Sequence, residues 1–232
     1  HFAKAMGKLE KTDAIDAVML AEFGRAIRPE VRKVPSEKAM ELNFLSTRYD
    51  QLIDMVRIEK TRLKQAPNDA IKSNIQEHIA YLERNKDKVA DEIDALIAQS
   101  TKWTTDSKIL RSVKGVGPVL TRTLIALLPE LGTLSRQKIT KLAGLAPISR
   151  DSGSSSGKRF ISGGRADVRS KLYMSVVASL RCDGMVKDCY TRLRAAGKPV
   201  KVALIACMRK LVTLLNALLR NQRPFKNPLP AT

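Results

Sequence analysis

Two long series of apolar residues, one on each side of Pro67, restrict the middle of the chain to helical structure. Their spacing alternates between three and four residues, which is typical of helices that pack along a seam. The series consist of Leu42, Leu45, Tyr49, Leu52, Val56 and Leu63, and then of Ile75, Ile79, Leu82, Val89, Ile93 and Leu96. Pro67 ends the first helix, and Asn68 or Asp69 can cap the second.

We therefore expect an α-hairpin or coiled coil over residues 36–100, with helices about 40 Å long at 1.5 Å per residue. Neither helix can bury its apolar stripe alone. We also expect this segment to join copies of the chain into a dimer or tetramer.

Composition favours a mainly α fold for all 232 residues: aromatic residues make up only 4%, and the 12 Gly and 10 Pro fall mainly between periodic segments. We find no apolar run of about 18 residues, so no membrane span is expected. The three cysteines (Cys182, Cys189 and Cys207) have no C-x-x-C spacing, which argues against a zinc site. We interpret them as reduced, largely buried thiols of a cytoplasmic protein.

The net charge of +19 lies entirely in the second half of the chain. Residues 1–100 hold 17 basic and 17 acidic residues, whereas residues 101–232 hold 25 basic and six acidic ones. Such an excess indicates a polyanionic partner. A membrane surface is the competing explanation, but no basic helix here carries Trp or Phe anchors, so nucleic acid is favoured.

A polar, basic segment runs from Lys141 to Ser175. A short apolar helix ends at Pro147, a loop rich in Ser and Gly follows, and a basic helix begins near Arg165. The hydroxyls, the permissive backbone and the dense positive charge suit a phosphodiester. A flexible solvated loop has the same composition, so both interpretations stay open.

The sequence Gly115-Val116-Gly117 separates two apolar helical patterns and resembles the turn of a helix-hairpin-helix motif. Such a turn presents backbone N–H groups at a helix start to a DNA phosphate. Lys114 and Arg122 would add positive charge. A tight turn between helices gives the same letters.

Near the N-terminus, residues 8–27 have helical periodicity, with Thr12 as the expected N-cap. Asp13 and Asp16 then lie three residues apart on one face, where two carboxylates can share a divalent cation such as Mg²⁺. The alternative is that they only complement the helix dipole. At the other end, residues 200–219 are almost entirely apolar and are expected to form the core helix of the basic half.

Four segments together resemble one family: GKLEKTDAIDAVMLAEF, LRSVKGVGPVLTRTLIALLPELG, AGLAPISRDSGSSSGKRFISGGRADVRSKLYMSVVA, and Ala203 to Leu211. This family comprises the DEDD transposases of bacterial insertion sequences (insertion-sequence 110 family), bridge-RNA-guided recombinases related to the Piv and MooV invertases. The resemblance covers nearly the whole chain and is weakest over 36–100.

The resemblance implies a mainly α chain that carries the remnant of an N-terminal RuvC-like α/β domain in residues 1–35. A coiled coil over 36–100 and a basic, all-helical transposase domain over 101–225 would follow. The transposase domain would contain a helix-hairpin-helix-like unit (108–130) and a catalytic serine loop (147–165), and residues 226–232 would be a tail.

Within this family a serine before glycine is the nucleophile, and Ser152 is the matching residue. Four acidic residues hold Mg²⁺, and Asp13 and Asp16 match the last pair. The first Asp and the Glu have no counterpart here, so the chain looks like one that lacks its N-terminal segment, and we expect it to be inactive by itself.

The partners implied by the resemblance are donor DNA, target DNA and a structured guide RNA, in the cytoplasm and at the nucleoid of a bacterium. The expected DNA- and phosphate-binding residues are Lys114, Gly115, Gly117, Arg150, Lys158, Arg159, Arg165 and Arg169. Two other functions stay open. One is a non-catalytic, dimeric DNA- or RNA-binding module, and the other is a structural coiled-coil protein, which would leave the basic half unexplained.

Overall fold

The computed structural model describes all residues except 1, 8–9, 11, 29–33, 149–158 and 227–232. The chain divides into two compact units, residues 1–36 and 37–232. The first unit contains α1 (Phe2–Ala5) and α2 (Asp13–Ile27). As predicted, Thr12 is the N-cap of α2: its hydroxyl accepts a hydrogen bond from the Ile15 N–H at 3.3 Å. The helix thus starts at Asp13, later than the apolar periodicity suggested.

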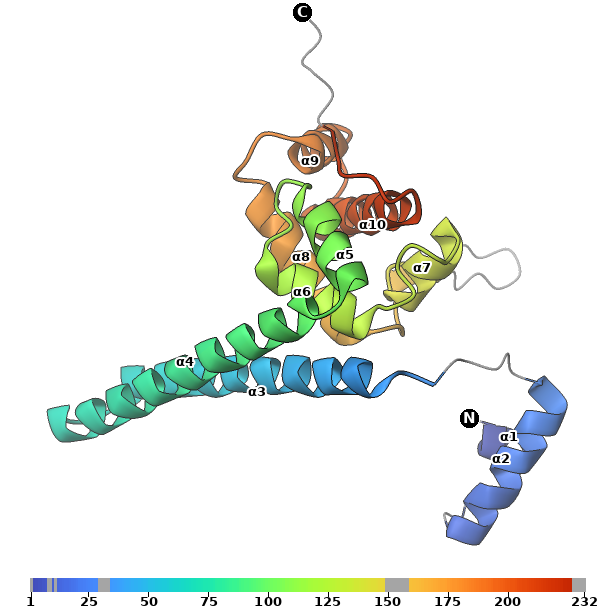
Figure 1. Ribbon diagram of the computed structural model, residues 1–232, viewed down its shortest axis with the longest axis horizontal. Coiled ribbons are helices and arrows are strands. Elements are labelled where there is room, and N and C mark those ends of the chain that lie inside the picture. Colours follow the sequence, from blue (N-terminus) through green and yellow to red (C-terminus); the bar gives the residue numbers. More distant parts are fainter. Residues whose placement is uncertain (1, 8–9, 11, 29–33, 149–158, 227–232) are drawn as a thin grey trace, which may run out of the picture. The chain divides into compact units, whose positions relative to one another are not determined.

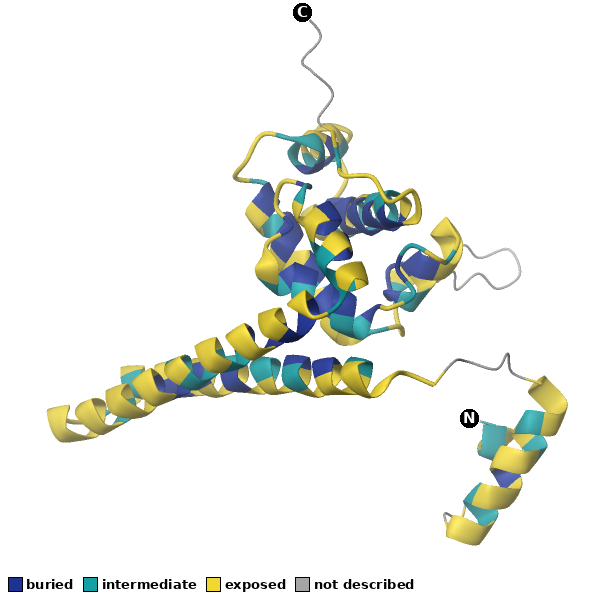
Figure 2. Ribbon diagram, viewed as in Figure 1, coloured by how far each residue is buried: buried dark blue, intermediate teal, exposed yellow. Residues whose placement is uncertain are grey.

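In the second unit, α3 (Glu37–Gln65) and α4 (Asp69–Ala98) form an antiparallel hairpin (Figure 1). The side chain of Asn68 caps α4 by accepting from the Ile71 N–H at 2.9 Å. An ion pair of 2.7 Å joins Lys60 to Glu83 across the two helices. The outer half of the hairpin encloses only a small apolar cluster and is mostly exposed (Figure 2).

The inner end of the hairpin is fixed to the six helices of the remaining chain. Leu42 and Ile93 are each 1% exposed and belong to the main hydrophobic core. Arg122 donates from Nε to the Asp94 carboxylate at 2.7 Å, with its guanidinium 6.0 Å from the centre of the Tyr49 ring. Arg122 therefore serves the contact with the hairpin, and it does not add free charge to the glycine turn as the sequence suggested.

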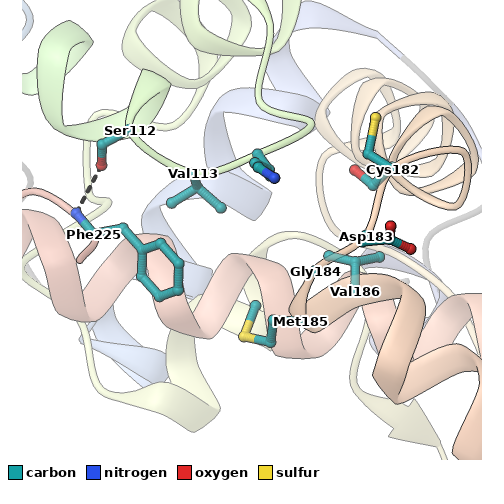
Figure 3. A pocket seen from close by; sticks show the side chains of 10 residues that line it. Ser112, Val113, Cys182, Asp183, Gly184, Met185, Val186 and Phe225 are labelled. Carbon is teal, nitrogen blue, oxygen red and sulfur yellow. Dashed lines mark hydrogen bonds between the residues drawn. The ribbon is translucent and has the colours of Figure 1, made fainter. Parts of the chain in front are cut away.

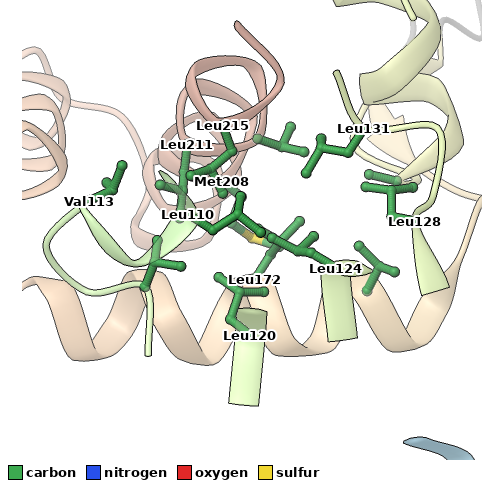
Figure 4. Close-up of a cluster of buried hydrophobic side chains, with 14 of the residues drawn as sticks. Leu110, Val113, Leu120, Leu124, Leu128, Leu131, Leu172, Met208, Leu211 and Leu215 are labelled. Atoms are coloured by element: carbon green, nitrogen blue, oxygen red, sulfur yellow. The ribbon is translucent and has the colours of Figure 1, made fainter. Parts of the chain in front are cut away.

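The remaining helices form a compact body around α10, which packs against α5, α7, α8 and α9. These helices are α5 (Thr101–Arg111), α6 (Pro118–Leu127), α7 (Arg136–Leu142), α8 (Ala166–Ser179), α9 (Met185–Ala195) and α10 (Val200–Arg220). Leu211 and Leu215 of α10 are completely buried, and Figure 4 shows them beside Leu110, Leu124 and Leu172. The predicted mainly α fold is confirmed, and α10 is the core helix expected from its composition.

By length and composition, α10 is also apolar enough to cross a membrane, which corrects the expectation that no such stretch exists. The charged residues among its 21 residues are Lys201, Arg209, Lys210 and Arg220. Half of its most apolar window is buried against other helices. A core helix with this packing passes the same test.

Two short strands are the only ones within the described residues: β1 (Pro147–Ile148) and β2 (Phe160–Ile161). They pair antiparallel, with Pro147 opposite Ile161 and Ile148 opposite Phe160. The two ends of the Ser- and Gly-rich segment therefore lie side by side.

Candidate nucleic-acid interface

The turn between α5 and α6 exposes its polar and glycine positions while its apolar positions anchor it. Val113 and Val116 are 3% and 5% exposed, whereas Lys114, Gly115 and Gly117 are exposed. Gly117 is the N-cap of α6 without a side-chain hydrogen bond, and Pro118 follows as the first helical residue. The first N–H groups of a helix have no intrahelical acceptor and carry partial positive charge. The turn can therefore accept an anion at this end of α6.

Gly115 is held closely against α8. Its backbone has φ +87°, a left-handed conformation that disfavours other residues. A Cβ atom at this position would lie 1.7 Å from the Ser179 hydroxyl oxygen. The Gly115 carbonyl oxygen also accepts a hydrogen bond from the hydroxyl of Ser175. Both geometry and space thus require glycine here.

A half-open pocket of about 130 Å³ lies beside the glycine turn (Figure 3). Its apolar lining includes Val113, Met185 and the Phe225 ring, and Lys114 and Asp183 supply charges. The main-chain N–H of Phe225 donates to the Ser112 hydroxyl at 2.7 Å, which ties the C-terminal segment to the end of α5. The Ser112 and Ser179 hydroxyls that line the pocket donate to main-chain carbonyls, and Asp183 pairs with Lys187, so we assign the pocket no chemistry.

The two ends of the Ser-rich segment are packed tightly where they enter the body. Gly164 has φ +63°, and a Cβ atom there would lie 2.3 Å from the Gly144 nitrogen. The Arg165 N–H donates to the Leu142 carbonyl at 2.9 Å. Together with the pairing of β1 and β2, these contacts fix where the segment leaves the body.

Two of the predicted phosphate ligands have acceptors within the protein. The guanidinium of Arg165 donates to both carboxylate oxygens of Glu130, at 2.5 and 2.6 Å, and to the Leu127 carbonyl at 2.8 Å. Arg169 donates to the Gly163 carbonyl at 2.7 Å. A phosphate at Arg165 would have to compete with Glu130, so its DNA contact stays a prediction.

Sequence reasoning overlooked Glu130. It is one of only six acidic residues in residues 101–232, and it directly follows Pro129 at the end of α6. A lone carboxylate in so basic a region is a signal for an internal ion pair, and that signal was available. Its partner was not identifiable, because the two residues are 35 positions apart.

Other predicted site residues fall at the edge of the described chain or beyond it. Ser152, Arg150 and Lys158 lie outside the described residues. Arg159 is exposed and directly precedes β2. Their roles therefore stay predictions.

Asp13 and Asp16 occupy the first turn of α2, in the first unit, with Asp13 exposed and Asp16 half-buried. Over the part of the chain that the structure describes, no group of three or more His, Cys, Asp and Glu side chains could hold a metal ion. Two carboxylates still suit Mg²⁺, which commonly takes one or two carboxylates and completes its shell with water and substrate phosphates. They equally complement the helix dipole.

Two family models match different parts of the chain. One, described as "Transposase IS116/IS110/IS902 family", matches residues 107–191, which include the glycine turn, β1, β2 and α8. A second, a DEDD transposase model of IS110 type, matches residues 1–68, which include Asp13 and Asp16.

Relatives of known name align over most of the chain. The pilin gene-inverting protein of Moraxella bovis is 28% identical over 228 residues, covering 97% of this chain and 70% of the relative. Its counterpart in Moraxella lacunata is 29% identical over 231 residues, with the same two coverages. An uncharacterized 44.8 kDa protein of insertion element IS116 from Streptomyces clavuligerus is 31% identical over 160 residues, or 66% of this chain and 38% of the relative.

Proposed function

Because this chain belongs to the IS116/IS110/IS902 family of transposases, we propose that it cleaves DNA and transfers strands with a serine nucleophile, assisted by Mg²⁺ and guided by RNA. The observation that carries the proposal is the order of the matches. A DEDD transposase model covers the N-terminal part and the second transposase model the basic part, and inverting proteins align across both. A binding module alone would not need the DEDD part that carries Asp13 and Asp16.

The domain organisation in this proposal follows the same division. Residues 1–35 would be the end of a RuvC-like domain, residues 36–100 an arm, and residues 101–225 the transposase domain. The arm would join copies of the chain into a dimer or tetramer. Four apolar side chains on one face of α3 are 41–76% exposed and support this role: Met40, Phe44, Met55 and Ile58.

In the proposed reaction, the Ser152 oxygen forms a bond to a DNA phosphorus and the bond from phosphorus to the 3′ oxygen breaks. The 3′ oxygen takes up a proton and becomes a free hydroxyl, and the 5′ phosphate stays linked to the protein. The 3′ hydroxyl can later attack the phosphoserine link of another strand, which restores the serine. Charge that develops on the phosphate requires cations nearby, and Lys158, Arg159 and Arg169 are the candidates.

Asp13 and Asp16 would hold the Mg²⁺ ion through carboxylate oxygens, the ligands that this hard cation prefers. When bound, the ion would neutralise phosphate charge and lower the pKa of a coordinated hydroxyl. The two carboxylates project from neighbouring positions of the first turn of α2, where Thr12 fixes the helix start. Guidance by RNA is supported by the family resemblance and by the excess of positive charge in residues 101–232.

The test uses the protein expressed from the longest reading frame that encodes this chain. It is incubated with Mg²⁺, the RNA of its element, and donor and target DNA, and denaturing gels then reveal protein–DNA adducts. We expect an adduct in wild type and in the control Ser170→Ala, and none in Ser152→Ala or Asp13→Ala. An adduct retained by Ser152→Ala would move the nucleophile to a neighbouring serine. DNA binding by wild type without any adduct would leave the non-catalytic binding module.

A further inference from the structure

A turn that binds phosphate must keep its carbonyl oxygens away from the anion. Each peptide group of such a turn carries an acceptor and, except before proline, a donor, and an exposed carbonyl oxygen would repel a phosphate. The inference rests on the proposed action on DNA and on the predicted phosphate contact of the turn at Lys114–Gly117. It concerns what fixes the direction of the peptide groups in that turn.

The Gly115 carbonyl points into the protein, toward α8. Its acceptor capacity is used by the hydroxyl of Ser175, a side chain 60 residues away and only 8% exposed. The hydroxyl of Ser179, 4% exposed, donates in turn to the Ser175 carbonyl at 2.7 Å. On this buried face of α8, Ser175 donates to the Gly115 carbonyl, and Ser179 occupies the space that a side chain at position 115 would need.

Other polar groups of the turn also have partners within the protein. The Val116 N–H donates to the Val113 carbonyl at 3.0 Å and is therefore used inside the turn. The Gly117 carbonyl accepts from the Thr121 N–H at 3.0 Å. Pro118 has no N–H, so the α6 donors without an intrahelical acceptor are the N–H groups of Val119 and Leu120, and Lys114 of the turn is exposed. We propose that Ser175 is a positioning residue for DNA, because its hydrogen bond holds the Gly115 carbonyl inward and leaves the turn able to contact a phosphate.

The same helix holds the far end of α6. Arg165, the N-cap of α8, donates to the Leu127 carbonyl at the last residue of α6. The segments at both ends of α6 are therefore attached to α8. Gly115, in the turn before the Gly117 N-cap, is held by Ser175, and Leu127 is held by Arg165. Only residues 162–165 separate β2 from α8, so the glycine turn and the β1–β2 ribbon are both connected to this helix.

The experiment measures binding of a fluorescent DNA duplex to the protein of the full reading frame between 50 and 200 mM salt. The variants are Ser175→Ala, which removes the hydroxyl, and Ser175→Thr, which keeps it. The matched control is Ser170→Ala, an exposed serine of the same helix. If the altered turn no longer holds the phosphate, the charge of Lys114 no longer displaces a counterion, and the magnitude of the slope of log K against log salt falls by about 0.9. Between 50 and 200 mM salt, the fold decrease in affinity should therefore be about 3.5 times smaller for Ser175→Ala than for wild type. The variant should also bind every DNA sequence more weakly than wild type does.

Ser175→Thr and Ser170→Ala should keep the wild-type slope even if the threonine methyl group lowers the melting temperature. A purely structural role would lower the melting temperature of Ser175→Ala and leave the slope unchanged, and that result overturns the inference. If Ser175→Ala does not fold, Ser175→Cys, of similar size and with a weaker donor, tests the same bond. Absence of salt-dependent DNA binding by wild type would overturn the proposed function as well, whereas an unchanged slope in a binding-competent variant overturns only the role of Ser175.

Discussion

The ion pair of Arg165 and Glu130 gives the sharpest test of how this domain uses its positive charge. Two hydrogen bonds of 2.5 and 2.6 Å join the groups, and the side chains are 29% and 30% exposed. A hydrogen bond to a charged group contributes about 1.5–3 kcal/mol, and an exposed ion pair only about 0–1 kcal/mol. For this partly exposed pair we expect a loss of about 2 kcal/mol when either partner is neutralised.

In a chain of this length, 1 kcal/mol shifts the melting temperature by about 2–4 °C. Arg165→Gln and Glu130→Gln should therefore each lower it by about 4–8 °C. The double variant should lose less than the sum of the two single losses, because the second change removes a group whose partner is already absent. Calorimetry of the three variants measures both quantities.

DNA binding then separates the structural role from the predicted phosphate contact. If Arg165 serves only Glu130, Arg165→Gln keeps the wild-type salt slope once folding is complete. If Arg165 also binds phosphate, its variant lowers the slope by about 0.9, while Glu130→Gln leaves the affinity unchanged or raises it. Melting temperatures within 1 °C of wild type for both single variants, on the order of the noise of the assay, would refute the reasoning from the geometry of the pair.

Three further predictions concern the glycine turn, the hydrophobic core and the cysteines. Gly115→Ala should cost at least about 1–2 kcal/mol from the left-handed backbone alone, and should lower both the melting temperature and DNA affinity. Leu211→Ala, at a completely buried position, should cost about 2–5 kcal/mol in denaturant unfolding. At pH 8 an alkylating reagent should label the exposed Cys182 and leave Cys207 unlabelled in mass spectrometry, because burial and the neighbouring Cys189 raise the pKa of Cys207 to about 12 and only the thiolate reacts.

Much of the helical framework could be predicted because its signals are local. Thr12 and Asn68 cap their helices through residues three positions away, and the apolar composition of residues 200–219 identified the core helix. The glycines of the turn could be recognised for a similar reason. Gly115 adopts a backbone conformation that few other residues tolerate.

The partners of charged side chains could not be predicted, since they are distant in sequence. Arg122 was expected to strengthen the glycine turn, yet it lies against Asp94, 28 positions earlier in the chain. Arg165 was expected to face phosphate and is paired with Glu130. Periodicity shows which face of a helix is buried. It does not show which of the many basic side chains will form an ion pair with one of the few carboxylates.

The attachment of the hairpin has a mechanical consequence. Asp50 of α3 is bound to Lys171 of α8 at 2.5 Å, and α3 continues for another 15 residues to Gln65. At 1.5 Å per residue this free part is about 22 Å long, so a tilt of about 10° at its root would displace its tip by about 4 Å. The hairpin thus projects from a contact with α8, the same helix that holds the glycine turn. A small movement at the contact with α8 would thus appear as a larger displacement at the tip of the hairpin.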